Sequence, residues 1–325
     1  MDEFKFIDSI KQSYYRQSSV IKGIGDDCAV IREGYHDIIT AVDTMVDEVH
    51  FSRETMSTYD IGYRVLAANI SDIAAMGAWP TSYMISIVIP DEYTDEELQS
   101  IYQGMDDLAR GYDMDLIGGD TVTGKQLVIS VTIHGIVPKG KARYRSAMEA
   151  GDILFVTGTL GDSSAGLDLL LGRIEASDGV DYLTARHRQP TPRVHFSHQL
   201  THLDRLALND VSDGISSEAH ELAQASNKTV YIDDEQVPIN PYLKQFCLEK
   251  QTYYKYSGGE DFELIGSVAP QHMRELKNIA NQQGLLLTII GEIKDQPNTN
   301  GNVFLRKSGI ITPLEKRGYT HKNEG

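Results

Sequence analysis

The sequence predicts two α+β domains, each with a mixed β-sheet covered by helices, and three observations support this fold class. The chain has 325 residues, enough for two domains of ~150 residues each. Strand-length runs rich in β-branched residues alternate with longer runs of helical periodicity. A polar, basic stretch at 138–143 interrupts this alternation, so we expect the domains to comprise residues 1–138 and 139–325.

In the first half, strands are expected at three β-branched runs, residues 38–43, 83–90 and 127–137. Apolar residues at helical spacing predict a helix over 60–76, with Asp60 as its N-cap and Gly77 as its stop. A second helix is expected to begin in the capping box that starts at Thr94 and to end at Gly111. The glycine pair before Asp120 is interpreted as a turn.

The second half alternates in the same way. Strands are expected at 152–158, 229–232, 261–268 and 286–290. Helices are expected at 163–171, 193–206, 216–225 and 271–283.

The charge balance narrows the classes of partner. There are 30 Lys and Arg against 47 Asp and Glu, a net charge of −17, which argues against nucleic acid or an anionic membrane as a partner. We expect no membrane span, because no 18-residue apolar run occurs. Two cysteines, Cys28 and Cys247, are too few for a disulfide scaffold, so a cytoplasmic location is expected.

Acidic residues recur beside small residues and at strand ends. Each of them alone is explained by a turn or a solvated helix face. Asp72 is different, because it lies in an otherwise apolar helical stretch where a carboxylate needs a partner. Converging carboxylates repel one another unless a cation neutralises them, and oxygen ligands without clustered Cys or His indicate magnesium or manganese.

No motif for a protein nucleophile is present: the sequence lacks GxSxG and HExxH. The run from Gly119 to Lys125 matches GxxxxGK, but Gln126 replaces the expected Ser or Thr and a strand-like run follows. If the attacking group is an anionic phosphate of a substrate, no protein nucleophile is needed. Catalysis then consists of positioning and charge neutralisation, as in phosphoryl transfer.

Eight short motifs in order carry a resemblance that spans nearly the whole chain: GIGDDCA at 23–29, DTMV at 43–46, HF at 50–51, NISDIAAMGA at 69–78, GGDT at 118–121, VTGTLGDS at 156–163, DVSDG at 210–214 and SGGEDFEL at 257–264. In this order they resemble the thiamine-monophosphate kinases, a family of the aminoimidazole ribonucleotide synthetase-like superfamily. The resemblance implies ATP-dependent phosphorylation of thiamine monophosphate to thiamine diphosphate by direct in-line transfer. It further implies a homodimer formed through the N-terminal sheet, with ATP and substrate in the groove between the domains.

The resemblance also implies roles for individual residues. Catalytic roles fall to Asp72, Asp120 and Asp210, and the implied ATP contacts are Gly119, Asp120, Arg145 and Ser212. Several Mg²⁺ ions are implied at Asp27, Ala41, Val42, Asp43, Asp72, Asp120, Asp210 and Asp213. Implied substrate contacts are His50 and Glu260, although a surface imidazole is the simpler interpretation of His50 from sequence alone.

The C-terminus departs from the family pattern. The family closes its GYxH segment with an aromatic residue, whereas Lys322 stands at that place here. Tyr319 and Lys322 are therefore the candidate substrate contacts at this end.

Two alternatives remain at this point. One is another ATP-using superfamily member, such as a cyclo-ligase, a selenophosphate synthetase or a hydrogenase-maturation protein. A selenophosphate synthetase needs a reactive Cys or selenocysteine near its N-terminus, and none precedes Ser13. The other is a non-catalytic protein that binds thiamine phosphates or nucleotide, which ADP release in the presence of thiamine monophosphate would exclude.

Overall fold

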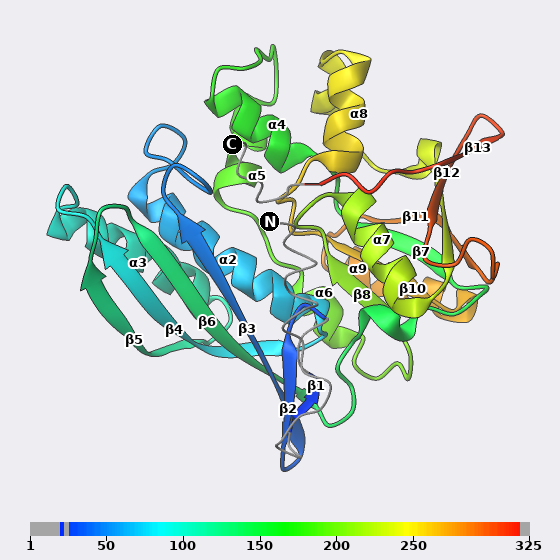
Figure 1. Ribbon diagram of the computed structural model, residues 1–325, viewed down its shortest axis with the longest axis horizontal. Helices are drawn as coiled ribbons and strands as arrows, with labels where there is room; N and C mark the ends of the chain where they lie inside the picture. The colour runs from blue at the N-terminus through cyan, green and yellow to red at the C-terminus, as the bar shows by residue number, and fades with distance from the viewer. Residues whose placement is uncertain (1–19, 23–25, 319–325) are drawn as a thin grey trace.

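The chain folds around two β-sheets that lie side by side (Figure 1), in a computed structural model that describes residues 20–22 and 26–318. The first sheet ends at Pro138 and the second begins at Ile153. The predicted class, mixed α/β with two mixed sheets, is confirmed. None of the helices in the described ranges is long and apolar enough to cross a membrane.

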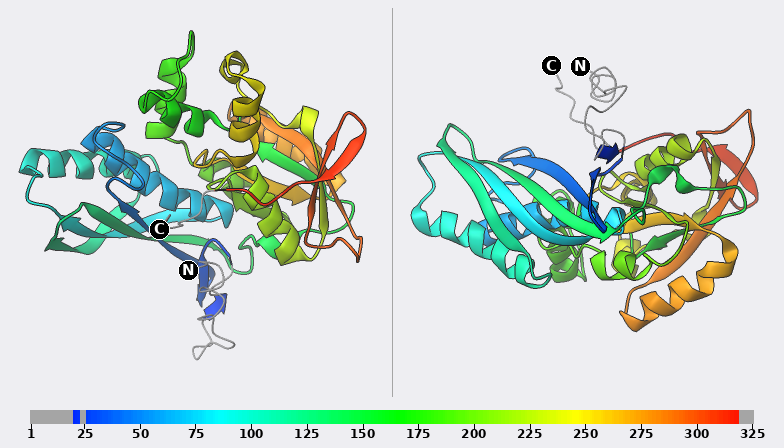
Figure 2. Two further views of the ribbon diagram at one scale, coloured as in Figure 1. Left: turned by 45° about the horizontal axis from the view of Figure 1, so that its top comes forward. Right: turned by 90° about the horizontal axis from the view of Figure 1, so that it is seen from below.

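In the described part of the chain, the N-terminal sheet has six strands in the order β1-β2-β3-β6-β4-β5. Only β4 and β5 pair in parallel. Helices α2 (Thr58–Ala75) and α3 (Asp95–Arg110) cover one face (Figure 2). The strands are β1 (Val20–Lys22), β2 (Ala29–Glu33), β3 (His36–Val46), β4 (Trp79–Ile89), β5 (Asp115–Thr123) and β6 (Val128–Pro138).

Alternation along β6 shows why this sheet has one covered face. Ile129, Val131 and Ile133 are buried under the helices, whereas the residues between them are only half-buried. The opposite face is left to other partners or to solvent. Every residue of β5 at the sheet edge is exposed.

The expected turn at the glycine pair is wrong, because Gly118, Gly119 and Asp120 lie in the middle of β5. Glycine is needed here for close packing: a Cβ on Gly119 would lie 2.0 Å from the carbonyl oxygen of Ile85 on β4. Glycines in a strand mark close backbone approach as well as turns, and the prediction of a turn took account only of the second.

The C-terminal sheet has seven strands in the order β13-β12-β9-β11-β7-β10-β8 across the described residues, with β12 and β9 as its parallel pair. Its strands are β7 (Ile153–Thr157), β8 (Ala207–Asp210), β9 (Thr229–Asp233), β10 (Leu264–Val268), β11 (Leu287–Lys294), β12 (Val303–Lys307) and β13 (Ile310–Pro313). Its helices are α4 (Asp162–Leu170), α5 (Val180–Arg188), α6 (Val194–Gln199), α7 (Ile215–Ser226), α8 (Leu248–Ser257) and α9 (Met273–Gln282). Short 3₁₀ turns occur at Arg145–Ala147, Asp234–Gln236, Pro241–Gln245 and Pro270–His272.

Both faces of this sheet are covered, as β7 illustrates. Leu154 and Val156 pack in the cluster that includes α7, whereas Phe155 packs in the cluster that includes α6 and α9. Neighbouring residues of one strand thus enter different cores, as the period of two requires.

Several predicted boundaries differ from the structure. Helix α2 begins two residues early because Ser57 is its N-cap, and Asp60 is the third residue of the helix, where its side chain completes the capping box. The helix expected at 193–206 comprises only α6, because Leu200 and Leu203 reach the core from turns whose spacing imitates a helix. The strand expected from residue 261 starts at Leu264, after a loop in which Glu260 and Phe262 have positive φ. Helices α5 and α8 were not predicted, because both are polar with little apolar periodicity.

Candidate active site

A cavity of about 1290 Å³ lies between the two domains. The N-terminal domain contributes the end of β3, the following loop and the C-terminal half of α2 to its wall. The C-terminal domain contributes the β8–α7 turn, one side of α8, the loop before β10 and the segment after β13. Of the predicted site residues, the lining includes Asp43, His50, Asp72, Asp210, Ser212, Asp213 and Glu260.

Three carboxylates from distant parts of the chain meet beside this cavity. Asp27 follows β1, Asp72 lies on α2 and Asp210 ends β8, and one oxygen of each lies within 4.8 Å of the others. We call Asp27, Asp72 and Asp210 the carboxylate cluster. The Oδ2 atom of Asp27 is buried and has no hydrogen-bond partner among the described residues. A hard divalent cation such as Mg²⁺ fits this all-oxygen set and would give that oxygen a partner.

The protonation of the carboxylate cluster reflects crowding of like charges in a buried place. Burial raises the pKa of Asp72 well above its usual range, and Asp43 and Asp210 raise it further. Burial and the Asp27 carboxylate raise the pKa of Asp210 to about 8. The pKa of Asp43 is raised by burial and by Asp27. Such a group binds a cation in preference to remaining ionised alone.

Among the described residues, Arg145 is the cation that pairs with the carboxylate cluster. Its guanidinium forms an ion pair with Asp27, and its Nε donates to Oδ1 of Asn209 at 2.9 Å. Burial lowers the pKa of Arg145, but Asp27 and neighbouring acids raise it above its ordinary value overall. Burial outweighs this pairing for Asp27, whose pKa remains raised. One arginine therefore does not neutralise the cluster.

Neighbouring residues that were not among the predicted site residues hold the acids in place. The Ser71 hydroxyl donates to Oδ2 of Asp210 at 2.8 Å, and Oδ1 of Asn69 accepts from the Asp43 backbone N–H at 3.2 Å. Both residues belong to the NISD motif, so their position beside Asp72 was the available signal.

Glu218 on α7 is a further residue without an assigned role. It is buried, and it accepts from Nδ2 of Asn209 at 2.5 Å and from the Asp213 backbone N–H at 3.1 Å. Burial, followed by the nearby Asp210 and Asp213, raises its pKa well above the usual range. No signal like that of Asp72 was present in the sequence, because Glu218 follows Ser216 and Ser217 and precedes His220 in a largely polar stretch.

The remaining predicted residues lie elsewhere. Asp120 and Gly119 are exposed on β5 and do not line the cavity. In the sheet register Asp120 on β5 and Thr44 on β3 lie in the same row, with β4 and β6 between them. Three strand spacings, about 14 Å, therefore separate the backbones of Asp120 and Thr44. Ala41 and Val42 lie on β3 just before Asp43 and do not line the cavity. Tyr319 and Lys322 lie outside the described residues.

His50 reaches the cavity from the loop after β3. Its Nδ1 accepts a hydrogen bond from the Val46 backbone N–H at 3.0 Å. This bond fixes the ring and makes Nε2 the protonated nitrogen when the ring is neutral.

Comparison with known proteins identifies the family. Residues 25–137 match the model of the AIR synthase related protein N-terminal domain, and residues 149–303 match that of its C-terminal domain. The thiamine-monophosphate kinase of Bacillus subtilis is 42% identical, with 99% of each chain covered. The crystal structure of that kinase from Stenotrophomonas maltophilia K279a matches with a TM-score of 0.77 and 32% identity, covering 89% of this chain and 92% of that chain. AaThiL complexed with AMPPCP and TMP matches with a TM-score of 0.84 and 28% identity, and the match covers 99% of this chain and 97% of that chain. The chain therefore belongs to the thiamine-monophosphate kinase family of enzymes.

Proposed function

We propose that this chain transfers the γ-phosphoryl group of ATP to thiamine monophosphate, yielding thiamine diphosphate and ADP. The observation that carries the proposal is the carboxylate cluster, whose charge is not balanced by the described residues and whose Asp72 and Asp210 border the interdomain cavity. The full-length likeness to the B. subtilis kinase supports the choice of substrate, as does the likeness to AaThiL, which was solved with AMPPCP and TMP.

In this proposal the carboxylate cluster, Asp43 and Asp213 hold Mg²⁺ ions, and bound Mg²⁺ neutralises the charge that the phosphates bring. Asn69 and Ser71 fix the backbone of Asp43 and the carboxylate of Asp210, so the acids keep their orientation. Arg145 and Ser212 are proposed to contact ATP, and a guanidinium suits phosphate because it donates two parallel hydrogen bonds.

The attacking oxygen belongs to the phosphate of thiamine monophosphate, which is largely ionised near neutral pH because its second pKa is ~6. The chain therefore has no proton to remove, and we propose direct in-line transfer without a phosphoenzyme. The task of the protein is to place two anions close together, end to end.

The substrate is proposed to lie between the domains, with His50 contributed by the first and Glu260 by the second. Tyr319 and Lys322 remain predicted substrate contacts. The two cysteines described are free thiols, and a cytoplasmic location remains our expectation.

We further propose a homodimer formed through the uncovered face and β5 edge of the N-terminal sheet. Val42, Leu116, Ile117 and Val122 expose 60%, 46%, 57% and 46% of their surface there, and an exposed apolar group of this kind marks an interface. Because Asp120 and Gly119 lie on this same edge, we propose that they complete the site of the second copy. Sedimentation should show a dimer, and charged replacements of Leu116 and Ile117 should yield monomers without activity.

The test of the proposed reaction follows both products. Purified protein is incubated with ATP, Mg²⁺ and thiamine monophosphate, with thiamine and an aminoimidazole ribonucleotide precursor as control acceptors. Equal amounts of thiamine diphosphate and ADP are expected only with thiamine monophosphate. ADP release with a different acceptor would reassign the substrate, and binding without ADP release would show a binding protein.

A further inference from the structure

Arg64 is a fully buried arginine on α2 that connects the N-terminal domain to the cavity wall of the C-terminal domain. One of its terminal nitrogens lies 2.6 Å from Oε2 of Glu260. The other donates a hydrogen bond to the backbone carbonyl of His187 on α5. Its carbon Cζ also lies 5.7 Å from the ring centre of Phe262. Arg64 itself does not line the cavity.

Glu260, in contrast, opens into the cavity, with 32% of its side chain exposed. Its backbone adopts φ of +65°, and its N–H donates to the Ser212 carbonyl at 2.6 Å. A non-glycine residue persists at such a φ only where its surroundings determine it. The Ser212 contact fixes the backbone, and the Arg64 contact fixes the carboxylate.

This arrangement carries a cost that packing alone does not explain. Burying an arginine requires compensation, and the one carboxylate paired with Arg64 in the described chain is partly open to solvent. Both residues could be replaced by apolar ones if their purpose were only to join the domains. A close ion pair with a buried guanidinium, however, holds the Glu260 carboxylate in place at the cavity wall.

The charge of Glu260 indicates which part of a substrate it faces. Phosphates belong at the carboxylate cluster, where cations bind, and a carboxylate repels them elsewhere. Thiamine monophosphate also has a cationic thiazolium ring and an aminopyrimidine with N–H donors, and a carboxylate attracts both.

We propose that Arg64 is a positioning residue, which holds the Glu260 carboxylate in place to recognise the cationic, non-phosphate half of the substrate. The inference rests on the proposed function. Arg64 acts through Glu260 and does not touch the substrate.

The experiment compares Arg64→Met, Arg64→Lys, Glu260→Gln and the double variant Arg64→Met/Glu260→Gln with the unchanged full chain. KM and kcat are measured for each substrate, and thiamine monophosphate binding is measured by calorimetry without ATP. The matched control is Arg188→Met. Arg188 also joins the domains, donating from Nε to the Thr55 carbonyl at 2.7 Å, but it does not line the cavity or contact Glu260.

Arg64→Met and Glu260→Gln are each expected to raise KM and Kd for thiamine monophosphate by about tenfold to a hundredfold, because the substrate would lose a well-placed charged partner, an effect of the size of one hydrogen bond to a charged group. KM for ATP should change less than about twofold, and the double variant should be no worse than the worse single one. Arg64→Lys, which keeps the charge, should recover part of the affinity. Arg188→Met should leave both KM values unchanged.

Three results would overturn the inference. One is an Arg64→Met enzyme with an unchanged KM for thiamine monophosphate. A second is a double variant in which the affinity losses of the two single variants multiply. A third is an equal rise in KM for both substrates that Arg188→Met reproduces. If Arg64→Met does not fold, Arg64→Lys and Glu260→Gln test the inference in its place, by a rise in KM for thiamine monophosphate without a rise in KM for ATP. An unchanged chain that neither binds nor phosphorylates thiamine monophosphate would refute the proposed function first, and this inference with it.

Discussion

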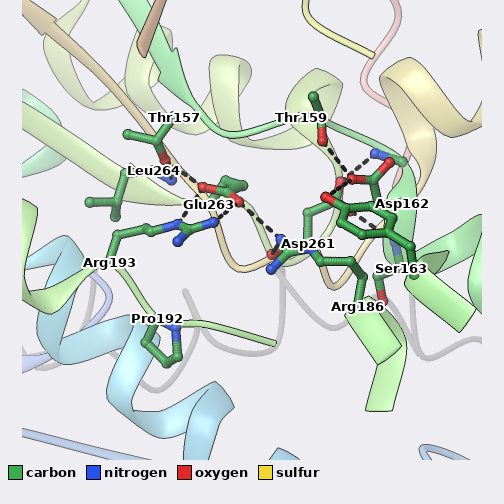
Figure 3. A network of polar contacts seen from close by, with 12 residues as sticks. Thr157, Thr159, Asp162, Ser163, Arg186, Pro192, Arg193, Asp261, Glu263 and Leu264 are labelled. Carbon is green, nitrogen blue, oxygen red and sulfur yellow. Dashed lines mark hydrogen bonds and ion pairs between the residues drawn. The ribbon is translucent and has the colours of Figure 1, made fainter. Parts of the chain in front are cut away.

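Glu263 and the carboxylate cluster are buried acids near the domain boundary, and they differ in how their charge is balanced. Around Glu263, Nε of Arg193 donates at 2.7 Å, a terminal nitrogen of Arg186 at 2.9 Å and the Thr157 hydroxyl at 2.7 Å (Figure 3). Burial raises the pKa of Glu263, but these partners lower it overall. In the carboxylate cluster, burial dominates and the pKa values are raised.

The difference distinguishes a structural acid from a ligand-binding one. Glu263 has its counter-charges within the chain, so its removal should cost stability. Among the described residues the carboxylate cluster has only Arg145, which does not balance its charge, so removal of an acid from the cluster should cost function and leave stability intact. Burial alone does not separate the two groups, since Glu263 and Asp210 are both almost completely buried.

The largest expected effect is on folding, at Glu263. Glu263→Gln leaves Arg186 and Arg193 without their buried partner, which should lower the free energy of unfolding by about 3–5 kcal/mol. Chemical denaturation measures this change. The control Glu292→Gln removes a carboxylate from a partly exposed pair with Arg306 and should cost at most about 1 kcal/mol. Equal stability of both variants would contradict a structural role for Glu263.

Asp72→Asn should produce the opposite pattern. Removal of one ligand for the phosphate-neutralising cations should lower kcat by about 10²–10³-fold. The midpoint of thermal unfolding should stay the same or rise, since a repelling charge is lost. Asp107→Asn, on the exposed side of α3, is the matched control and should be fully active. An active Asp72→Asn enzyme would remove Asp72 from the metal site.

Metal binding should stabilise the folded protein through the carboxylate cluster and not through Glu263. Mg²⁺ at 100 times its dissociation constant should raise the free energy of unfolding by about 2.7 kcal/mol. The Glu263→Gln variant should keep this gain, whereas Asp72→Asn should lose most of it. Excess chelator should abolish turnover. Full turnover in chelator, or equal stabilisation of Asp72→Asn, would argue against a metal site at the carboxylate cluster.

The last expected effect is on the pH dependence of stability and concerns Asp261, which accepts from the Gly161 and Ser163 backbone N–H groups at 2.6 and 3.1 Å. Burial and the nearby Asp162 raise its pKa to about 8. A carboxyl with a raised pKa binds its proton more tightly in the folded state, so its contribution to stability falls as pH rises from about 4 to about 8.

Asp261→Asn should remove the pH dependence that Asp261 gives to the free energy of unfolding, a slope of at most about 1.4 kcal/mol per pH unit. Denaturant titrations of both proteins across pH 4–8 measure it, and contributions of the carboxylate cluster cancel in the comparison. Parallel stability curves for the two proteins would mean that Asp261 remains ionised in the folded state.

The sequence was informative about the acids and less so about what surrounds them. Asp72 was singled out because a charge in an apolar helix needs a partner, and the structure places it beside Asp27 and Asp210. The strands expected at 38–43, 83–90 and 127–137 correspond to β3, β4 and β6, whose β-branched side chains favour a strand locally. The short strand β13 is also β-branched and was not predicted. The β5 strand was missed, because its glycines are selected by contact with β4 rather than by local conformation.

Contacts between distant segments were beyond reach for a related reason. In the sequence, Arg64 is one polar residue of a predicted helix. Its carboxylate partner Glu260 comes from the second domain and is apparent only in the folded structure. The location of Asp120 at the sheet edge follows from strand order, which composition and periodicity do not determine.

Helix α2 carries Arg64 and Asp72 eight residues apart, a little over two turns, or about 12 Å along its axis. The helix thereby acts as a ruler between the place where phosphates are proposed to bind and the carboxylate proposed to face the other half of the substrate. Inserting or deleting one residue between these positions would rotate one end against the other by about 100°. The length of α2 between residues 64 and 72 therefore sets the distance between the two proposed binding regions, and with it the size of the molecule that fits.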